Sequence, residues 1–262
     1  MDETKPRIAV HKFTSCDGCQ LAFLNAGEDL LALAERVNIV HFAEAGPIDP
    51  DAQVDIAFIE GSVSTPDEIE RINRIRERSR YLIIIGACAT SGGLQALRNL
   101  ASAPQWLSAV YPDPQHVASL DTSTPISRHV KVDLELWGCP VSTRQIIAAL
   151  SALLNGVDPT VTNQKLCMEC KRDQAVCVMV ARGTACLGPV TRSGCGALCP
   201  QFERGCYGCY GPSENPNAGA LTTRFAGLGL VGDDIARLLL SYHSAAPEFF
   251  NTGVRWLGSG DE

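Results

Sequence analysis

Cysteine is the residue type in this chain that offers the most chemistry. The chain has twelve cysteines among 262 residues: four are spread between positions 16 and 139, and eight lie between positions 167 and 209. A chain of this length can bury a hydrophobic core without disulfide staples, so these cysteines are expected to bind metal rather than one another. Zinc and iron–sulfur clusters are the two metal groups that suit sites made only of thiolates.

The first cysteine set consists of Cys16, Cys19, Cys88 and Cys139. Each lies just after an apolar run that is typical of a buried strand: "RIAVHKF", "YLIIIGA" or "VDLELWG". Because the carboxyl ends of parallel strands share one edge of a sheet, we expect these cysteines to converge there. Cys88 alone is more typical of a buried core thiol, and the C-x2-C pair alone of a redox dithiol, but the joint placement favours one shared site.

The other eight cysteines have spacings that suggest two further four-cysteine sites. The second cysteine set is Cys167, Cys170, Cys177 and Cys186, and the third cysteine set is Cys195, Cys199, Cys206 and Cys209. Zinc knuckles usually come as paired C-x2-C motifs, which only two of these spacings match. The Cys199–Pro200 pair is similar to the Cys-Pro ending of bacterial ferredoxin motifs. The pattern favours iron–sulfur clusters and electron transfer, and a zinc-stabilised interaction protein stays open as the alternative.

Strand-like and helix-like runs alternate over the first 156 residues. Strands are predicted at 7–13, 37–42, 54–60, 81–87 and 132–138. The segment Thr65–Glu68 fits a capping box with proline at the first helical position, and Ser142–Gln145 fits a second one, whose helix should end at Gly156. This alternation predicts an α/β fold in which helices cover both faces of a parallel sheet.

After residue 158 the character of the chain changes. The stretch from Cys167 to Cys209 is rich in glycine, proline and cysteine and has few apolar runs, so we expect bound metal to order it. The tail from Pro212 is predicted to hold one helix, with Asp233 as its N-cap. We therefore expect two domains: residues 1–158 with the first cysteine set, and a loop-rich domain at 159–262 that ends in a helical tail.

Composition and charge exclude several classes of protein. The net charge is −7 and no block of five or six basic residues occurs, which argues against a nucleic-acid partner. The amino terminus lacks the basic-then-apolar order of a signal peptide, and the longest apolar run, "YLIIIGACA", is far shorter than a membrane span. We expect a soluble, cytoplasmic, globular protein that makes no contact with a membrane.

Two smaller features bear on function. Gly227, Gly229 and Gly232 match the dinucleotide fingerprint, but no apolar strand precedes them and only 30 residues follow, so we expect a loop before a short helix. Glu60 ends the third predicted strand beside Gly61. It is a candidate either for a partner-facing or proton-relaying carboxylate or for one that binds the backbone.

The motifs around the cysteines resemble those of the small subunits of nickel–iron hydrogenases. "TSCDGCQ", "VDIAFIEGSVST", "IGACATSGG" and "LWGCP" resemble the blocks around the proximal cluster of that family. "CMEC" and "CLGPVTRSGCGALCPQFERGCYGC" resemble the blocks of its other two clusters. The resemblance is strongest to the delta subunits of cytoplasmic sulfhydrogenases, which are also described as NAD(P)-linked hydrogenases.

The resemblance implies a flavodoxin-like first domain and a specific set of cofactors. It places a proximal 4Fe–4S cluster on the first cysteine set, a distal cluster on the second and a medial cluster on the third. Membrane-bound and periplasmic relatives have histidine where Cys167 stands and proline in place of one medial cysteine, which gives a 3Fe–4S cluster. Because this sequence has cysteine at both places, we expect three 4Fe–4S clusters.

The resemblance also implies partners. A large subunit would hold the nickel–iron centre, a ferredoxin-like iron–sulfur subunit would extend the electron path, and a further subunit would bind FAD and NAD(P). The isolated chain would be inactive with hydrogen. One alternative is a hydrogenase that feeds a heterodisulfide reductase. Another is the small subunit of respiratory complex I, which has adjacent cysteines in place of C-x2-C and lacks the later cysteines.

Overall fold

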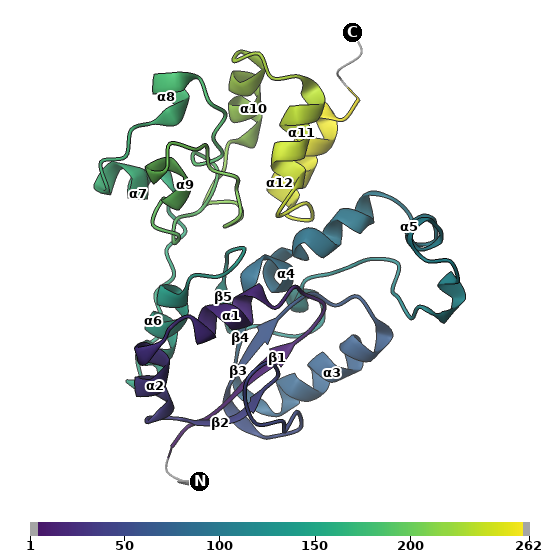
Figure 1. The fold of residues 1–262 in the computed structure, drawn as a ribbon, viewed down its shortest axis with the longest axis vertical. Helices are drawn as coiled ribbons and strands as arrows, with labels where there is room; N and C mark the ends of the chain where they lie inside the picture. Colours follow the sequence, from purple (N-terminus) through teal and green to yellow (C-terminus); the bar gives the residue numbers. More distant parts are fainter. Residues whose placement is uncertain (1–4, 259–262) are drawn as a thin grey trace. The chain divides into compact units, whose positions relative to one another are not determined.

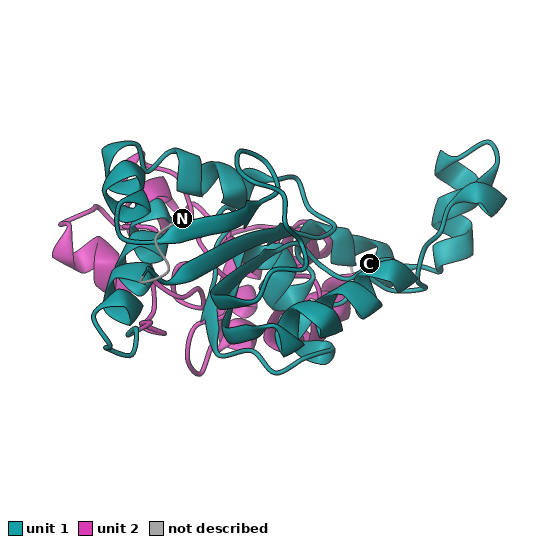
Figure 2. Ribbon diagram, turned by 90° about the horizontal axis from the view of Figure 1, so that it is seen from below, with its two compact units in different colours: residues 1–160 teal, residues 161–262 magenta. Residues whose placement is uncertain are grey.

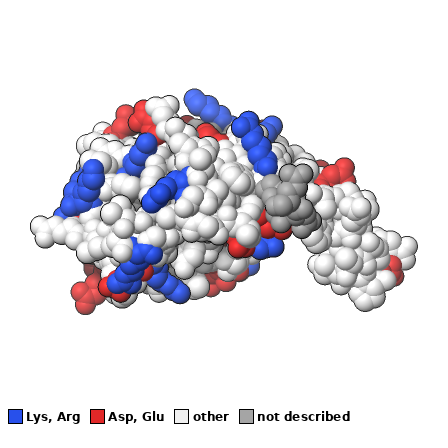
Figure 3. All heavy atoms as spheres, turned by 90° about the horizontal axis from the view of Figure 1, so that it is seen from above, with Lys and Arg blue, Asp and Glu red and all other residues white. Residues whose placement is uncertain are grey.

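A computed structural model describes residues 5–258 of the chain. The chain divides into two compact units, Met1–Thr160 and Val161–Glu262, which have separate colours in Figure 2. Acidic and basic side chains are interspersed over the face seen in Figure 3. Among the described residues, no helix combines the length and the apolar character needed to cross a bilayer.

Unit 1 is built on a five-stranded parallel sheet (Figure 1). The strands are β1 (Arg7–Lys12), β2 (Asn38–Phe42), β3 (Val54–Glu60), β4 (Ser79–Ile85) and β5 (Leu134–Leu136). All five coincide with predicted strands, within a few residues at their ends. Their order, β2-β1-β3-β4-β5, is that of flavodoxin-like folds, so the predicted α/β class is confirmed.

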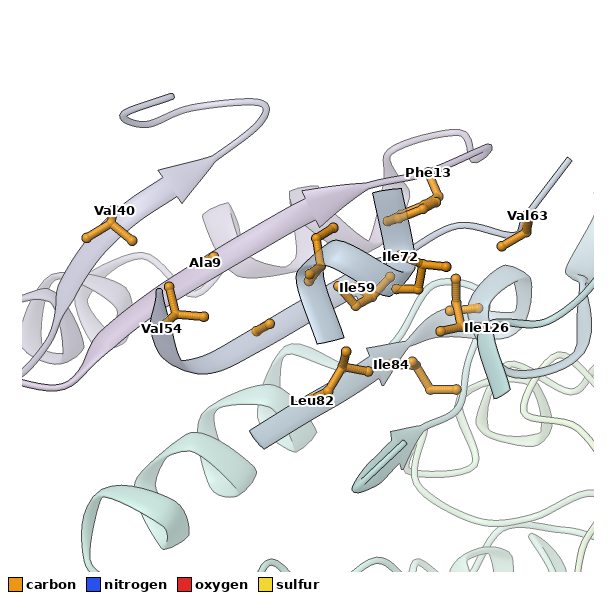
Figure 4. Close-up of a cluster of buried hydrophobic side chains, with 13 residues drawn as sticks. Ala9, Phe13, Val40, Val54, Ile59, Val63, Ile72, Leu82, Ile84 and Ile126 are labelled. Carbon is orange, nitrogen blue, oxygen red and sulfur yellow. The ribbon is translucent and has the colours of Figure 1, made fainter. Parts of the chain in front are cut away.

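Helices cover both faces of this sheet, as the sequence predicted. The helical segments are α1 (Gly18–Leu24), α2 (Glu28–Ala34), α3 (Pro66–Glu77), α4 (Gly86–Ser91), η1 (Gly93–Leu100), α5 (Ala103–Val110), η2 (Pro114–His116), η3 (Ile126–Arg128) and α6 (Thr143–Leu154). Ile72 of α3 packs against Ile59 and Ile84 on one face (Figure 4). On the other face, Phe23 of α1 meets Phe58 edge-on at 5.0 Å between ring centroids. Successive strand residues thus serve opposite faces, which explains the continuous apolar runs.

The two predicted capping boxes have different outcomes. At α3 the box forms: Glu68 N donates to Thr65 Oγ1 at 3.4 Å, and Thr65 N donates to Glu68 Oε2 at 3.1 Å. At α6 the helix and its end at Gly156, with φ +70°, are correct, but the box is wrong. The Ser142 side chain makes no capping bond, and Gln145 N donates to the carbonyl oxygen of Ser142 at 2.9 Å.

Unit 2 consists of short helices and long loops. Its helical segments are α7 (Cys167–Arg172), α8 (Val178–Arg182), α9 (Leu198–Gln201), α10 (Ala218–Ala226), α11 (Gly232–Leu240), α12 (Pro247–Gly253) and η4 (Val254–Trp256). Phe225, Ile235 and Phe249, from α10, α11 and α12, form a small core together with Leu187 from the cysteine-rich stretch. The large apolar side chains of this core therefore come chiefly from the three helices that follow the last cysteine.

The expectation of one helix in the tail was wrong, since α10 and α12 flank α11. Asp233 is not the N-cap either: Val231 occupies that position and Asp233 lies in the first turn, where its charge favours the helix dipole. The glycine motif at 227–232 connects α10 to α11 and follows a helix rather than a strand. The expected loop before a short helix is confirmed, and the preceding strand that the dinucleotide fingerprint needs is replaced by α10.

Candidate metal centres

The first cysteine set meets at the carboxyl edge of the sheet. Cys16 lies in the turn after β1, Cys19 in α1, Cys88 in α4 directly after β4, and Cys139 three residues after β5. Burial raises the pKa of Cys19 well above its usual range, and the nearby thiols of Cys88 and Cys139 raise it further. Burial, together with Cys139 and Cys16, raises the pKa of Cys88 to about 12. The structure therefore brings all four thiols close enough to interact.

Two glycines make room for these thiols. Gly86 has φ +84°, and a Cβ atom there would collide with the Sγ atom of Cys19. Gly93 has φ +57°, and a Cβ atom there would lie 2.8 Å from both the backbone nitrogen and the Sγ atom of Cys88. Positive φ at these positions also favours glycine in itself. Any larger residue would displace a sulfur atom of this set.

Glu60 supports the same edge from the end of β3. Its side chain is only 2% exposed, and its Oε1 atom accepts a hydrogen bond from Cys19 N at 2.9 Å. Burial raises the pKa of this carboxyl, although the bond from Cys19 counteracts the rise. Of the two roles expected for Glu60, the structure shows the backbone-binding one. A role toward a partner or in proton transfer stays a prediction.

The second cysteine set is also brought together. Cys167 and Cys170 lie in α7, Cys177 is the N-cap of α8, and Cys186 lies in the following loop. Burial, followed by the thiols of Cys167, Cys186 and Cys177, raises the pKa of Cys170 to about 11. The pKa of Cys167 is raised by burial and by the thiols of Cys186 and Cys177. Four interacting thiols again share one neighbourhood.

The third cysteine set is linked within two pairs. The pKa of Cys195 is raised mainly by burial and also by Cys199, and that of Cys206 by burial and also by Cys186 and Cys209. Cys206 N donates to the Sγ atom of Cys186 at 3.2 Å, so this set meets the second one directly. That its two pairs share one site stays a prediction.

Sequence reasoning missed Glu169, which stands between the two cysteines of "CMEC". Its carboxylate accepts hydrogen bonds from the backbone nitrogens of Gly194, Gly196 and Ala197 at 2.9, 3.0 and 3.1 Å. These amides flank Cys195 of the third set. The only signal in the sequence was an acidic residue inside a C-x2-C motif, which does not indicate what it binds.

The donor sets fit iron–sulfur clusters in their chemistry. All twelve cysteines are free, and the raised pKa values mean that metal-free thiols keep their protons until metal displaces them. Among residues 5–258, no group of three or more His, Cys, Asp or Glu side chains is arranged to hold a single metal ion. The ligand sets assigned to the three clusters stay predictions.

Comparison with known proteins identifies relatives along most of the chain. The family model described as NADH ubiquinone oxidoreductase, 20 kDa subunit, matches residues 16–153. The delta subunit of sulfhydrogenase 2 from Pyrococcus furiosus is 32% identical and is matched over 98% of its length by 90% of this chain. A subunit of the F420-non-reducing hydrogenase vhu of Methanococcus voltae is 31% identical over 80% of this chain and 83% of its own length.

A solved structure agrees with these relatives. One chain of a NAD+-reducing nickel–iron hydrogenase in its H2-reduced state is 33% identical, with a TM-score of 0.56, and is matched over 95% of its length by 60% of this chain. The chain belongs to the family of the NADH ubiquinone oxidoreductase 20 kDa subunit, within its branch of nickel–iron hydrogenase small subunits. As a hydrogenase subunit it is part of an oxidoreductase.

The family match also bears on the complex I alternative. It ends at residue 153, so it includes the first cysteine set and none of the later eight cysteines. The sulfhydrogenase subunit, in contrast, is matched by 90% of the chain. The likeness to complex I is therefore one of shared family, whereas the likeness to hydrogenase subunits extends over most of the protein.

Proposed function

We propose that this subunit carries electrons between the nickel–iron centre of a large subunit and a flavin- and NAD(P)-binding partner, through three 4Fe–4S clusters. The first cysteine set would hold the proximal cluster, the third the medial and the second the distal. The observation that carries the proposal is the convergence of four thiols from distant parts of the chain at one sheet edge. The hydrophobic core of this sheet is formed by apolar side chains and does not require the four thiols to lie together.

The residues of this edge would act by holding and shielding the cluster. When bound, a 4Fe–4S cluster takes up or releases one electron at a potential that depends on ligands, hydrogen bonds and burial. The four thiolates would fix its position, and Glu60 holds the backbone of Cys19 in place. Gly86 and Gly93 keep the space around Cys19 and Cys88 open. Burial of Cys19 excludes water from the side that faces the core.

The names of the relatives support the choice of partners. The sulfhydrogenase delta subunit and the chain of the NAD+-reducing nickel–iron hydrogenase both come from hydrogenases of several subunits, and the latter reduces NAD+. The partners proposed here are a large nickel–iron subunit, a ferredoxin-like iron–sulfur subunit and a flavin subunit that binds NAD(P). Without them the chain would not react with hydrogen.

All-cysteine ligation has a consequence for the potentials. Thiolate ligands and complete 4Fe–4S clusters favour lower potentials than histidine ligation or a 3Fe–4S centre. A low and even series of potentials suits reversible exchange with NAD(P)H. A redox titration of the complex should therefore find no high-potential 3Fe–4S signal, and finding one would contradict the assignment of the third cysteine set.

The direct test is anaerobic purification of the native complex. Nickel, iron and flavin should be present, and hydrogen should reduce NAD or NADP. The visible absorbance should be broad and should bleach with dithionite. Colourless protein that contains zinc in place of iron would overturn the proposal in favour of a zinc-stabilised interaction protein.

A second candidate function has one observation in its favour. The relative in Methanococcus voltae is named as part of an F420-non-reducing hydrogenase. In that case the electrons could pass to a heterodisulfide reductase instead of NAD(P). The subunits that purify with this chain distinguish the two candidates, since only the first requires a flavin subunit that binds a nicotinamide.

A further inference from the structure

Glu169 joins the second cysteine set to the loop of the third. It lies in α7 between Cys167 and Cys170, so its backbone belongs to the second set. Its Oε1 atom accepts from Gly194 N at 2.9 Å, and its Oε2 atom accepts from Gly196 N at 3.0 Å and from Ala197 N at 3.1 Å. One carboxylate therefore holds three backbone amides on both sides of Cys195.

The loop that Glu169 holds has an unusual backbone. Gly194, Gly196 and Ala197 have φ values of +134°, +71° and +53°. Neighbouring amides in such conformations point into a common hollow that binds anions. Ala197 is also fully buried, and a left-handed conformation is unfavourable for a residue with a side chain. The carboxylate of Glu169 fills this hollow and stabilises a loop shape that would otherwise be costly.

Further contacts connect the same two segments. The Nε2 atom of Gln201 donates to the carbonyl oxygen of Gly196 at 2.7 Å and to Oδ2 of Asp173, the C-cap of α7, at 3.2 Å. Residues 164–166 and 191–193 also pair in antiparallel fashion: Leu166 N donates to Thr191 O at 2.8 Å. The second and third cysteine sets are therefore connected at several points. Among these contacts, the hydrogen bonds of Glu169 lie on both sides of Cys195.

The connection matters because the two sets meet at a second place. Cys206 N of the third set donates to Sγ of Cys186 in the second at 3.2 Å, and both residues are buried. The sulfur of Cys186 in the second set thus accepts a hydrogen bond from the backbone of Cys206 in the third set. The efficiency of electron transfer between two centres falls steeply with their separation, so even a small shift of the loop would slow the transfer.

We propose that Glu169 is a positioning residue that fixes the third cysteine set relative to the second and thereby sets the rate of electron transfer between their clusters. This inference rests on the proposed function and adds a residue that binds no metal itself. Its carboxylate acts through backbone amides, and the ligands themselves are unchanged when it is replaced.

The test compares variants of the purified hydrogenase complex. Glu169→Gln keeps the shape of the side chain but replaces one accepting oxygen with a carboxamide NH2 group, which cannot accept from a backbone amide, and Glu169→Ala removes all three bonds. Glu203→Gln is the matched control, because Glu203 lies between Cys199 and Cys206 and pairs with Arg182 at 2.7 Å on the surface. Both Gln variants remove one negative charge from the same region.

Three measurements are needed: iron content, the magnetic interaction between reduced clusters in electron paramagnetic resonance spectra, and the rate at which hydrogen-derived electrons reach the second set. We expect Glu203→Gln to match wild type in all three. Glu169→Gln should hold full iron, show an altered interaction signal and transfer electrons several-fold more slowly, with a larger effect in Glu169→Ala.

Two results would overturn it. One is a Glu169→Gln complex with full iron and with the interaction signal and transfer rate of wild type. The other is loss of iron from all three sets together, which would make Glu169 a general stabiliser of folding. Failure of the proposed function is distinguishable from both, since wild-type complex would then lack iron or fail to pass electrons from hydrogen.

Discussion

The two units of this chain hold their cysteines by different physical means. In unit 1 the four cysteines come from three segments far apart in sequence and lie at the edge of a sheet with its own core: Phe58, Ile84 and Ile85 are completely buried. In unit 2 eight cysteines follow one another on α7, on α9 and in the loops around α7, α8 and α9, and these three helices have only six, five and four residues. Helices this short are not stable by themselves.

This difference shows which interactions hold the cysteines of each unit in a defined conformation. Unit 1 presents its thiols at the edge of a sheet that has its own hydrophobic core, so the shape of this edge does not depend on bound metal. The cysteine-rich stretch of unit 2 depends on cross-links between loops, such as the bonds of Glu169 and the bond from Cys206 N to Cys186 Sγ. Bound metal would add the strongest of these cross-links.

Removal of the metal should give the largest difference between the two units, in the protection of their amides against hydrogen exchange. After cluster destruction with a chelator and a mild oxidant, amides of residues 161–216 should lose their protection against hydrogen exchange. Structural metal sites contribute on the order of 10 kcal/mol to folding, which is more than short helices can replace. Amides of β3 and β4 should keep their protection. Equal loss in both regions, or in neither, would break the comparison.

Replacement of one cysteine of the first set should abolish activity while the cysteines of unit 2 keep their iron. Cys19→Ser should abolish hydrogen-driven reduction of NAD(P), because the proximal cluster would be lost from the electron path. The iron content of the complex's small subunit should fall by roughly one third, since the eight later cysteines still bind their clusters. Ser15→Ala, one residue before the motif, serves as the control. If activity survives with the first site empty, the proximal assignment is wrong.

Acid should weaken unit 1 through a buried histidine. His11 is 5% exposed, and burial, together with His41 and Arg71, lowers its pKa from 6.5 to about 3. Between those values only the unfolded chain is protonated, so stability is full above pH 6.5 and falls as the pH drops. We expect a loss of about 2 kcal/mol between pH 6.5 and pH 5.

The measurement is urea unfolding of the chain followed by tryptophan fluorescence at several pH values. His11→Gln should flatten the pH dependence of the free energy of unfolding. His243 of unit 2 has its pKa lowered by burial to about 4, so acid weakens both units in the same direction. Equal slopes for wild type and His11→Gln would show that other groups dominate.

Substitutions at the starts of α3 and α6 should have the smallest effect on the stability of unit 1. Thr65→Ala removes a side-chain cap that the structure shows and should lower the free energy of unfolding by about 1 kcal/mol. Ser142→Ala removes no such bond and should stay within about 0.5 kcal/mol of wild type. Urea unfolding of the paired variants checks this, and a larger cost at Ser142 would mean that its capping box forms in solution.

Much of unit 1 could be predicted because its signals are local. The strands appear as continuous apolar runs, since residues such as Ile83 and Ile84 are buried against opposite layers. In unit 2 the local signals are weak. Helix α10 (Ala218–Ala226) contains Gly219 and two threonines, which favour a helix weakly, and it is stabilised by the Asn217 cap and by the packing of Phe225 into the core.

The sequence by itself determined the order of strands and helices in unit 1, the number of cysteines and the spacing of each set. Strand ends and cysteine spacings are properties of neighbouring residues, so they can be recognised without the fold. Tertiary structure alone decided the partners of Glu60 and Glu169. A carboxylate or hydroxyl accepts from whichever amide the fold brings to it, and those of Glu60 and Glu169 come from residues 25 to 41 positions away.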